Sequence, residues 1–341
     1  MHVRKKLWIS FAVMAGVAIA MVLFEWNWLR GPVSSYLSAR WGHPVVIHGD
    51  LRVELSPKPL VSAESVTLGN VPGASEPFMA RALRIDVRVD PLSLFGSAVS
   101  LPELTLVEPR VLLERDADGN GNWEFTRPAR APDIGSLQIA DGVIRYVNAA
   151  AATDVSLDVA TSPASATDAM PVHFSGKGRL HNQPFSVDGA GATLLALEDG
   201  DHPYRLNAQV RAGDSRLQFD GTVVPNQLEN VDGVLTLQGR DLSQLYPIVP
   251  VPFPWSPPYR LRGQLKHAAK VWTFHAFTGK VGNSDIAGTF ALDMSPAKPF
   301  VDADLVSTQL DYRDLGGLVG LPPPEPPTSR TAAQKRTAER W

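Results

Sequence analysis

The chain has 341 residues, of which 44% are hydrophobic and 20% charged, with a formal net charge of -3 and no cysteine. Such a composition supports a folded protein with a sizeable core, and the lack of cysteine excludes disulfides, thiolate metal sites and thiol catalysis. The near-neutral charge argues against bulk electrostatic binding of nucleic acid, and the 29 prolines argue against a mostly helical body.

The N-terminus carries an uncharged apolar run, LWISFAVMAGVAIAMVLF, at residues 7–24. As a helix this run would be about 27 Å long, close to the thickness of the hydrocarbon core of a bilayer. Arg4, Lys5 and Lys6 precede it, so the positive-inside rule places the N-terminus in the cytoplasm and the body on the other side. We therefore predict a transmembrane anchor over residues 7–29. Its membrane-facing side chains are Trp8, Phe11, Val13, Val17, Ile19, Val22 and Phe24.

Two other readings of this run are a cleaved signal peptide and a buried core helix. A signal peptide has a shorter apolar region and small residues at its cleavage site, whereas the bulky FEWNWLRG stands here. The flanking charges and tryptophans fit a membrane better than a core.

The body that follows is predicted to consist of strands, because its dominant hydrophobic period is two. The segments 84–90 and 204–211 alternate cleanly between apolar and polar residues, which is typical of antiparallel strands with one buried face. Short helices are expected only at 32–41, near 241–246 and near 311–319. Turns are predicted at five Asp-Gly pairs: Asp118-Gly119, Asp141-Gly142, Asp188-Gly189, Asp220-Gly221 and Asp232-Gly233.

A sheet with one apolar face must cover that face, and spacing alone leaves open how it does so. The sheet can close as a sandwich or barrel, or it can curl and keep an apolar trough. The residues alone favour the closed core. The side chains that would line either the trough or the core are Tyr204, Leu206, Val210, Leu217, Phe219, Ile286, Phe290 and Leu292.

The segment from Asp116 to Asn122 has the acidic spacing of a calcium-binding EF-hand loop at its first positions. However, Arg127 stands where the loop would need a glutamate, and the flanks are strands. We therefore interpret it as a hairpin tip with Trp123 folded back onto the sheet. The eight histidines form no metal-binding pair, and no phosphate-binding or nucleophile motif occurs, so we predict no catalytic residue, metal or cofactor.

Two segments have the composition of linkers. The proline-rich stretch at 247–258 is expected to be extended, and the polar tail at 321–341 to be disordered. Because no strand follows the tail, we expect the chain to be a fragment of a longer protein.

Three stretches of the body resemble the AsmA family of bacterial envelope proteins. They are GHPVVIHGDLRVELSPKPLVSAESVTLGN (42–70), ARALRIDVRVDPLSLFGSAVSLPELTLVEPRVLLERDADGNGNWEF (80–125) and FTGKVGNSDIAGTFALDMSPAKPFVDADLVSTQLDYRDLGGLVG (277–320). The most specific parts are the strand-PLSLFG-strand unit, the LERDADGNGNW tip and the stretch from GNSDIAG to LDYRDLG. Relatives are generally longer, which agrees with a C-terminally truncated member.

The resemblance implies a single-pass protein of the bacterial inner membrane with a periplasmic body. Its N-terminal part is similar to the chorein-like start of bridge-like lipid-transfer proteins, whose long curled sheet carries acyl chains along an apolar trough. The implied partners are phospholipids and the inner membrane, with outer-membrane or periplasmic envelope proteins as further partners, and no nucleic acid. The resemblance reverses the preference for a closed core.

The expected protein is thus mainly β: a transmembrane helix, then a long curled antiparallel sheet forming an open trough, with few short helices. Its expected function is non-catalytic phospholipid transfer toward the outer membrane; the alternative is an anchored scaffold that regulates assembly or targeting of outer-membrane proteins. The expected regions are a cytoplasmic tip (1–6), the anchor (7–29), a chorein-like region (30–130), a continuing sheet region (131–320) and a disordered tail (321–341).

Overall fold

The structure is a computed structural model that describes residues 25–95, 99–124, 132–162, 169–197, 200–225, 227–245, 254–295 and 300–316. The chain divides into two compact units. The first unit comprises Met1–Val210 and Gly221–Leu228, and the second comprises Arg211–Asp220 and Glu229–Trp341. The predicted boundary at 130 lies outside the described residues, as does the predicted tail, and the predicted regions stay a prediction.

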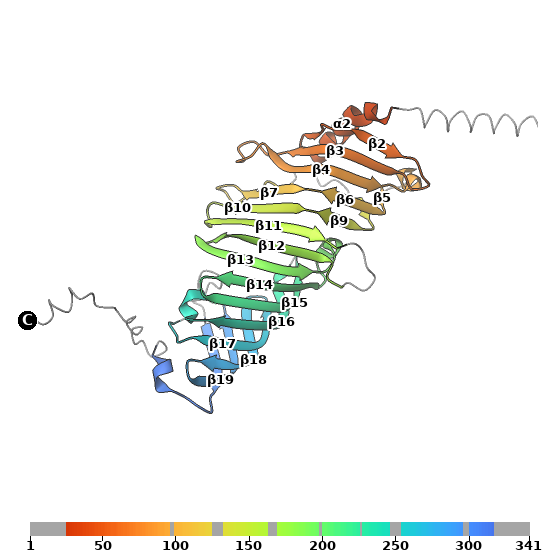
Figure 1. Cartoon of the computed structure of the whole chain (residues 1–341). Helices are drawn as coiled ribbons and strands as arrows, with labels where there is room; N and C mark the ends of the chain where they lie inside the picture. Colours follow the sequence, from red (N-terminus) through yellow and green to blue (C-terminus); the bar gives the residue numbers. More distant parts are fainter. Residues whose placement is uncertain are drawn as a thin grey trace, which may run out of the picture. The chain divides into compact units, whose positions relative to one another are not determined.

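The chain is mainly β with few short helices, as predicted (Figure 1). The helices are the α-helix α2 (Arg30–Trp41) and the 3-10 helices η1 (Trp26–Leu29), η2 (Pro91–Phe95), η3 (Leu194–Leu197), η4 (Leu242–Leu245) and η5 (Tyr312–Leu315). The strands up to the middle of the chain are β1 (Val45–Ile47), β2 (Leu51–Glu54), β3 (Leu60–Gly69), β4 (Phe78–Arg88), β5 (Ser100–Leu101), β6 (Glu103–Val107), β7 (Arg110–Arg115), β8 (Asp133–Ile134), β9 (Leu137–Ala140) and β10 (Gly142–Asn148). The later strands are β11 (Thr153–Thr161), β12 (Val172–Leu180), β13 (Gln183–Gly191), β14 (Tyr204–Ala212), β15 (Ser215–Val224), β16 (Gln227–Gly239), β17 (Tyr259–Ala268), β18 (Val271–Val281), β19 (Ser284–Asp293) and β20 (Phe300–Val306).

The short helix predicted at 32–41 is present as α2. It ends because Gly42 adopts a left-handed backbone (φ 74°) and donates its amide to the Ser38 carbonyl at 3.0 Å. The short helices expected near 241 and 311 are η4 and η5.

The predicted transmembrane anchor lies outside the described residues, apart from 25–29. The predicted membrane-facing residues Trp8, Phe11, Val13, Val17, Ile19, Val22 and Phe24 lie outside the described residues, and so do the preceding basic residues Arg4, Lys5 and Lys6. Within the described part of the chain, no helix combines the length and the apolar character needed to cross a bilayer.

The first unit begins as an antiparallel sheet around the long strand β3. β3 pairs with β4 on one side, while on the other side β1 pairs with its C-terminal half and β2 with its N-terminal half. Between the two short strands, the amides of His48 and Gly49 donate to the carbonyls of Ser65 and Glu64. The chain therefore bends at Gly49 without breaking its pairing to β3.

One part of the first unit is parallel, which corrects the prediction of a purely antiparallel sheet. β6 pairs with β9 and β7 pairs with β10, both in parallel. β6 and β7 follow each other with a short break at Glu108 (φ 47°). β9 and β10 follow each other with a similar break at Asp141 (φ 54°). The connection over 116–136 is long enough for the crossover that parallel pairing needs. Residue alternation cannot reveal this, because it is the same in both kinds of pair.

The strands from β10 onward in the first unit pair in sequence order, with β11, β12 and β13 each antiparallel to the strand before it. In the second unit β16 to β20 do the same. The ladder between β17 and β18 has a register shift between Arg262 and Gln264, where β18 carries one extra residue.

Three of the five turn predictions are wrong, because Asp188-Gly189, Asp220-Gly221 and Asp232-Gly233 lie inside β13, β15 and β16. The tight turn between β12 and β13 instead uses His181 and Asn182, both with positive φ (49° and 66°).

The pairings described for each unit leave its sheet open rather than closed into a barrel. They do not show the sheet curling around a trough, so the curl is not supported by the structure and stays a prediction.

Candidate functional site

The apolar face of the sheet is the strongest candidate for a functional surface. In the first unit the cross-strand register aligns Ile144 with Leu157, and then Gly176 with Val187 across the next two strands. Cross-strand partners point to the same side of a sheet. The side chains that share this face on β10 to β13 are Ile144, Tyr146, Val155, Leu157, Val159, Phe174, Phe185 and Val187.

The opposite face of the same strands is mostly polar. Its members include Arg145, Asp154, Ser156, Asp158, Ser175, Lys177, Arg179, Ser186 and Asp188. Arg145 donates to both carboxylate oxygens of Asp154 at 3.0 and 2.9 Å, and this hydrogen bonding lowers the pKa of Asp154. The sheet of the first unit thus separates an apolar side from a charged side.

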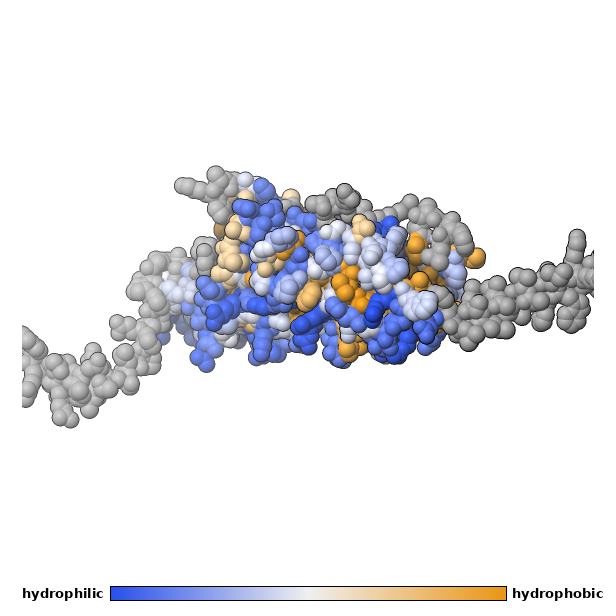
Figure 2. Space-filling model, turned by 90° about the horizontal axis from the view of Figure 1, so that it is seen from above, coloured by the Kyte–Doolittle hydropathy of each residue, from blue (hydrophilic) through white to orange (hydrophobic). Residues whose placement is uncertain are grey.

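The apolar face of the first unit is half-buried rather than buried. Of its eight large side chains on β10 to β13, only Val159 is fully buried, at 6% exposed. A packed core leaves such residues almost without solvent contact. This face therefore keeps part of its apolar surface accessible, and Figure 2 shows hydrophobic residues exposed among hydrophilic ones on the side that it displays.

Glycines on this face lie beneath aromatic rings. A Cβ atom at Gly189 would come within 2.5 Å of the Phe174 ring, and one at Gly191 within 2.3 Å of the Tyr204 hydroxyl. The Tyr204 hydroxyl donates to the Ala192 carbonyl at 2.9 Å, and burial raises the pKa of the phenol. These strands need glycine so that an aromatic ring can lie flat across the neighbouring backbone.

The second unit repeats this arrangement. A Cβ atom at Gly239 would lie 2.7 Å from the Tyr259 hydroxyl, which is 3.3 Å from the buried Ser215 hydroxyl. Gly191 and Gly239 each stand three residues before a 3-10 helix, η3 and η4 respectively, and the tyrosine opens the next strand in both cases. The two units thus share the order glycine, 3-10 helix, strand-opening tyrosine at these two places.

The apolar face of the second unit is more deeply buried. Phe274 and Phe277 stack in parallel with ring centroids 5.1 Å apart, and both are less than a tenth exposed. Tyr259, Leu261 and Leu292 on the same face are also buried.

The eight predicted lining residues all lie on apolar faces. Tyr204, Leu217 and Leu292 are buried. Leu206, Val210, Phe219, Ile286 and Phe290 are half-buried. Their role as a lipid lining stays a prediction.

Sequence reasoning missed the part of the apolar face on β10 to β13. The signal was present on β11, where Val155, Leu157 and Val159 alternate with polar residues. On β10 it was hidden, because Val143 and Val147 stand on the otherwise polar face.

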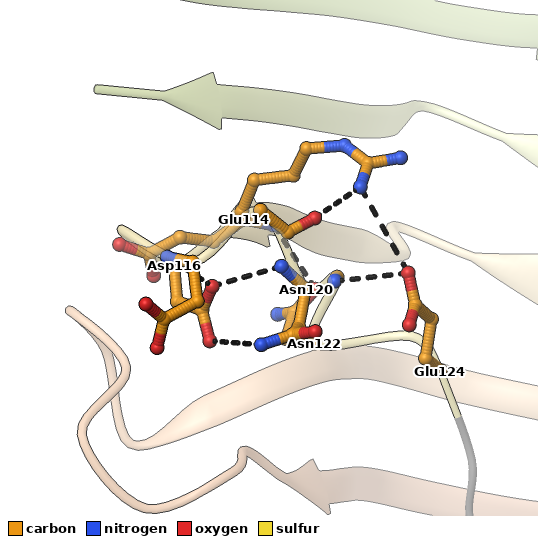
Figure 3. Close-up of polar contacts among 9 residues, drawn as sticks. Glu114, Asp116, Asn120, Asn122 and Glu124 are labelled. Atoms are coloured by element: carbon orange, nitrogen blue, oxygen red, sulfur yellow. Dashed lines mark hydrogen bonds and ion pairs between the residues drawn. The ribbon is translucent and has the colours of Figure 1, made fainter. Parts of the chain in front are cut away.

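The tip after β7 is a structural turn, and the Asp116 carboxylate in it is occupied by the protein's own donors (Figure 3). The Asp116 carboxylate accepts from the Asp118 amide at 2.9 Å, and from the Asn120 amide and side chain at 2.8 and 3.0 Å. The side-chain hydrogen bond from Asn120 is the main reason why the pKa of Asp116 is lowered.

Asn122 anchors this tip to the sheet. Only 3% exposed, its side chain donates to the Leu112 carbonyl at 2.9 Å and to Asn70 at 3.1 Å, and it accepts from the Glu114 amide. Trp123 packs back toward the sheet, 6.2 Å from the Tyr146 ring. Across the described residues, no three histidine, aspartate or glutamate side chains are grouped as metal ligands.

Comparison with known proteins agrees with the fold. A model of the AsmA family matches residues 4–192, more than half of the chain. "AsmA family protein YhjG" of Escherichia coli (strain K12) is 28% identical over 363 aligned positions, which cover 92% of this chain and 52% of that protein. The chain thus spans about half the length of this curated relative, and no solved structure matches it. Because the family model covers more than half of its sequence, the chain belongs to the AsmA family.

Proposed function

We propose that this chain handles phospholipids without catalysis, as an inner-membrane-anchored periplasmic protein that passes them toward the outer membrane. The observation that carries the proposal is the half-buried apolar face on β10 to β13, with the charged face behind it. An open apolar surface on one side of a sheet is suited to covering acyl chains.

The energetics favour such a surface over any catalytic group. Each methylene exposed to water costs about 0.8 kcal/mol, so a two-chain lipid faces a large barrier when it leaves a bilayer. A continuous apolar face lowers this barrier by keeping the chains covered, and half-buried side chains such as Ile144 and Leu157 offer the contact area.

Family membership supports a role in the bacterial envelope, and the basic N-terminus with its apolar run supports the anchor. The curl of the sheet into a trough, the direction of transfer and the outer membrane as destination belong to the proposal.

A second candidate function is an anchored scaffold for assembly of outer-membrane proteins. One observation favours it: all seven residues of β20 are exposed, including Phe300 and Val306 at 62% and 61%. An exposed apolar strand can pair with a strand of another protein.

The test compares two neighbouring residues of β11 that lie on opposite faces. Leu157→Asp places a charge on the apolar face, and Ser156→Asp places the same charge between Arg145 and Lys177 on the polar face. We expect the full-length Leu157→Asp protein to fold but to retain much less phospholipid after purification, measured by mass spectrometry of extracted lipid. Ser156→Asp should retain the wild-type amount.

Unchanged lipid content in a folded Leu157→Asp protein would contradict the lipid-binding role of this face. Purified wild-type protein without phospholipid, but with bound outer-membrane protein, would favour the scaffold.

A further inference from the structure

The first helical segment of the body is fixed to the sheet along one side. On α2, the Ser38 hydroxyl accepts from the Val45 amide at 2.8 Å and the Ser34 hydroxyl accepts from the Ile47 amide at 3.2 Å. Both bonds hold the helix against β1. Ser34 and Ser38 are one helical turn apart and therefore lie on one face.

Two further contacts fix the start of this segment. The Asn27 side chain in η1 accepts from the Leu51 amide at 3.2 Å, and Arg30 donates to the His48 and Gly49 carbonyls at 3.3 and 3.2 Å. η1 and α2 are thus held in a defined orientation on β1 and β2.

The other side of this segment exposes aromatic residues. Tyr36 stands two positions from both Ser34 and Ser38, about 160–200° around the helix, and is 63% exposed. Trp28 in η1 is 74% exposed. Tyrosine and tryptophan have an apolar ring and a polar group, and they are enriched where membrane meets water.

The charge of the segment has the sign expected for a membrane surface. Between Glu25 and Asp50 the sequence contains no acidic residue, while Arg30 and Arg40 are basic. The chain as a whole carries a net charge of -3, so this segment differs from the rest. The net positive charge of the segment favours its approach to anionic lipid headgroups.

The proposed anchor would bring a bilayer close to this surface. The apolar run ends at Phe24, and the described structure begins at Glu25. Since each residue spans at most about 3.6 Å, Trp28 lies within about 14 Å of the end of the run.

We propose that the exposed side of η1 and α2, with Trp28 and Tyr36, lies in the headgroup region of a phospholipid bilayer. This contact holds β1 and β2 at the membrane surface, so that the sheet of the first unit starts where lipid is available. The inference rests on the membrane anchoring in the proposed function and deepens it by naming the surface that meets the lipid.

The absence of cysteine permits a direct test by single-site labelling of the full chain. Ala39→Cys places an environment-sensitive fluorophore one turn from Tyr36, at an exposed position of α2. Ser175→Cys places the same label on the exposed polar face of β12 as a control. Both proteins are reconstituted into vesicles of phosphatidylethanolamine and phosphatidylglycerol, with and without a headgroup spin-labelled phospholipid.

We expect the label at 39 to be quenched several-fold more strongly than the label at 175. Adding Tyr36→Ser to the Ala39→Cys protein should weaken that quenching, because the aromatic contact with the interface is lost. The effect should also fall at high salt, since part of the attraction is electrostatic.

Equal quenching at 39 and 175, in protein that floats with the vesicles, would overturn this contact and leave the lipid-binding face of β10 to β13 untouched. A blue-shifted label at 39 without quenching would indicate a protein partner and would also overturn it. Protein that does not float with the vesicles would overturn both this contact and the proposed anchoring.

Discussion

The apolar faces of the two units have the same sequence pattern but different burial. On β10 to β13 of the first unit, Ile144, Leu157 and Val187 stay half-buried. On β17 and β18 of the second unit, Leu261, Phe274 and Phe277 are buried. Alternation with a period of two therefore determines which side of a strand is apolar, but not whether that side is covered.

The side chains that are aligned across neighbouring strands account for part of this difference in burial. In the second unit, Phe274 aligns with Phe290 on β19, and Phe277 fills the space beside Gly263. In the first unit, Gly176 and Gly178 stand in matched rows with branched or aromatic neighbours, Leu157 and Val187 beside one and Val155 and Phe185 beside the other. The stacked rings of Phe274 and Phe277 fill the face of the second unit.

The largest expected effect is a charge in the filled face. Phe277→Asp should destabilise the second unit by several kcal/mol, because an unpaired carboxylate would be buried at a site that is 4% exposed. Amide hydrogen exchange along β18 would measure it. The control is Thr278→Asp, which is exposed, pairs with Arg262 and should leave exchange unchanged. If the amides of β18 in Phe277→Asp were as protected from exchange as in the wild type, the apolar face of the second unit would also be open, and the two faces would not differ.

A second substitution sharpens the comparison by applying one change to both faces. Phe274→Ala should cost about 3–5 kcal/mol, as expected for a buried phenylalanine. Phe174→Ala should cost roughly half of that or less, because the half-buried ring gives up less apolar contact. Chemical denaturation of the full chain, followed by exchange on β12 and β18, would separate the two values. Equal losses would mean that both faces are packed alike.

A third prediction concerns the buried hydrogen bonds that Asn122 makes to β7 in the first unit. Asn122→Ala should destabilise the edge of β7 by about 1–3 kcal/mol, because it leaves the Glu114 amide and the Leu112 carbonyl without partners. Asn120→Ala is the control, since Asn120 is exposed and its side chain donates only to Asp116. Exchange rates at Glu114 would report the difference. Unchanged exchange in Asn122→Ala would show that the hydrogen bonds of Asn122 contribute little to the stability of the first unit.

The smallest expected effect is a pH dependence in the second unit. Hydrogen bonds from the Thr308 side chain and the Gln309 amide lower the pKa of Asp285 to about 2. Its unfolded value is about 3.9, so its stabilising contribution is complete above that pH and is lost as the pH falls toward 2. Thermal unfolding between neutral and acid pH should therefore depend less on pH in Asp285→Asn than in the wild type. The exposed Asp302→Asn variant provides the control.

The strand content and the polarity of the faces could be predicted from the sequence, because alternation is a local signal. Tyr204, Leu217 and Leu292 were placed on apolar faces from spacing alone, and the structure buries all three. The parallel pairing of β7 with β10 could not be predicted, since it depends on a crossover rather than on alternation. The turn prediction at Asp188-Gly189 was wrong because glycine there makes room for the Phe174 ring. The burial of the apolar side chains could not be predicted, because it depends on which side chains are neighbours across strands.

The pairing of consecutive strands also has a consequence for how the chain folds. From β10 to β13, and again from β16 to β20, each strand bonds to the strand that directly follows it in sequence. Such contacts are short in sequence separation, so each hairpin closes at a low entropic cost and at a high rate. A chain that emerges progressively from its N-terminus can add one hairpin at a time onto the strand already formed. The most recently added strand is then the exposed edge at every stage, and it needs protection from association until the next strand arrives.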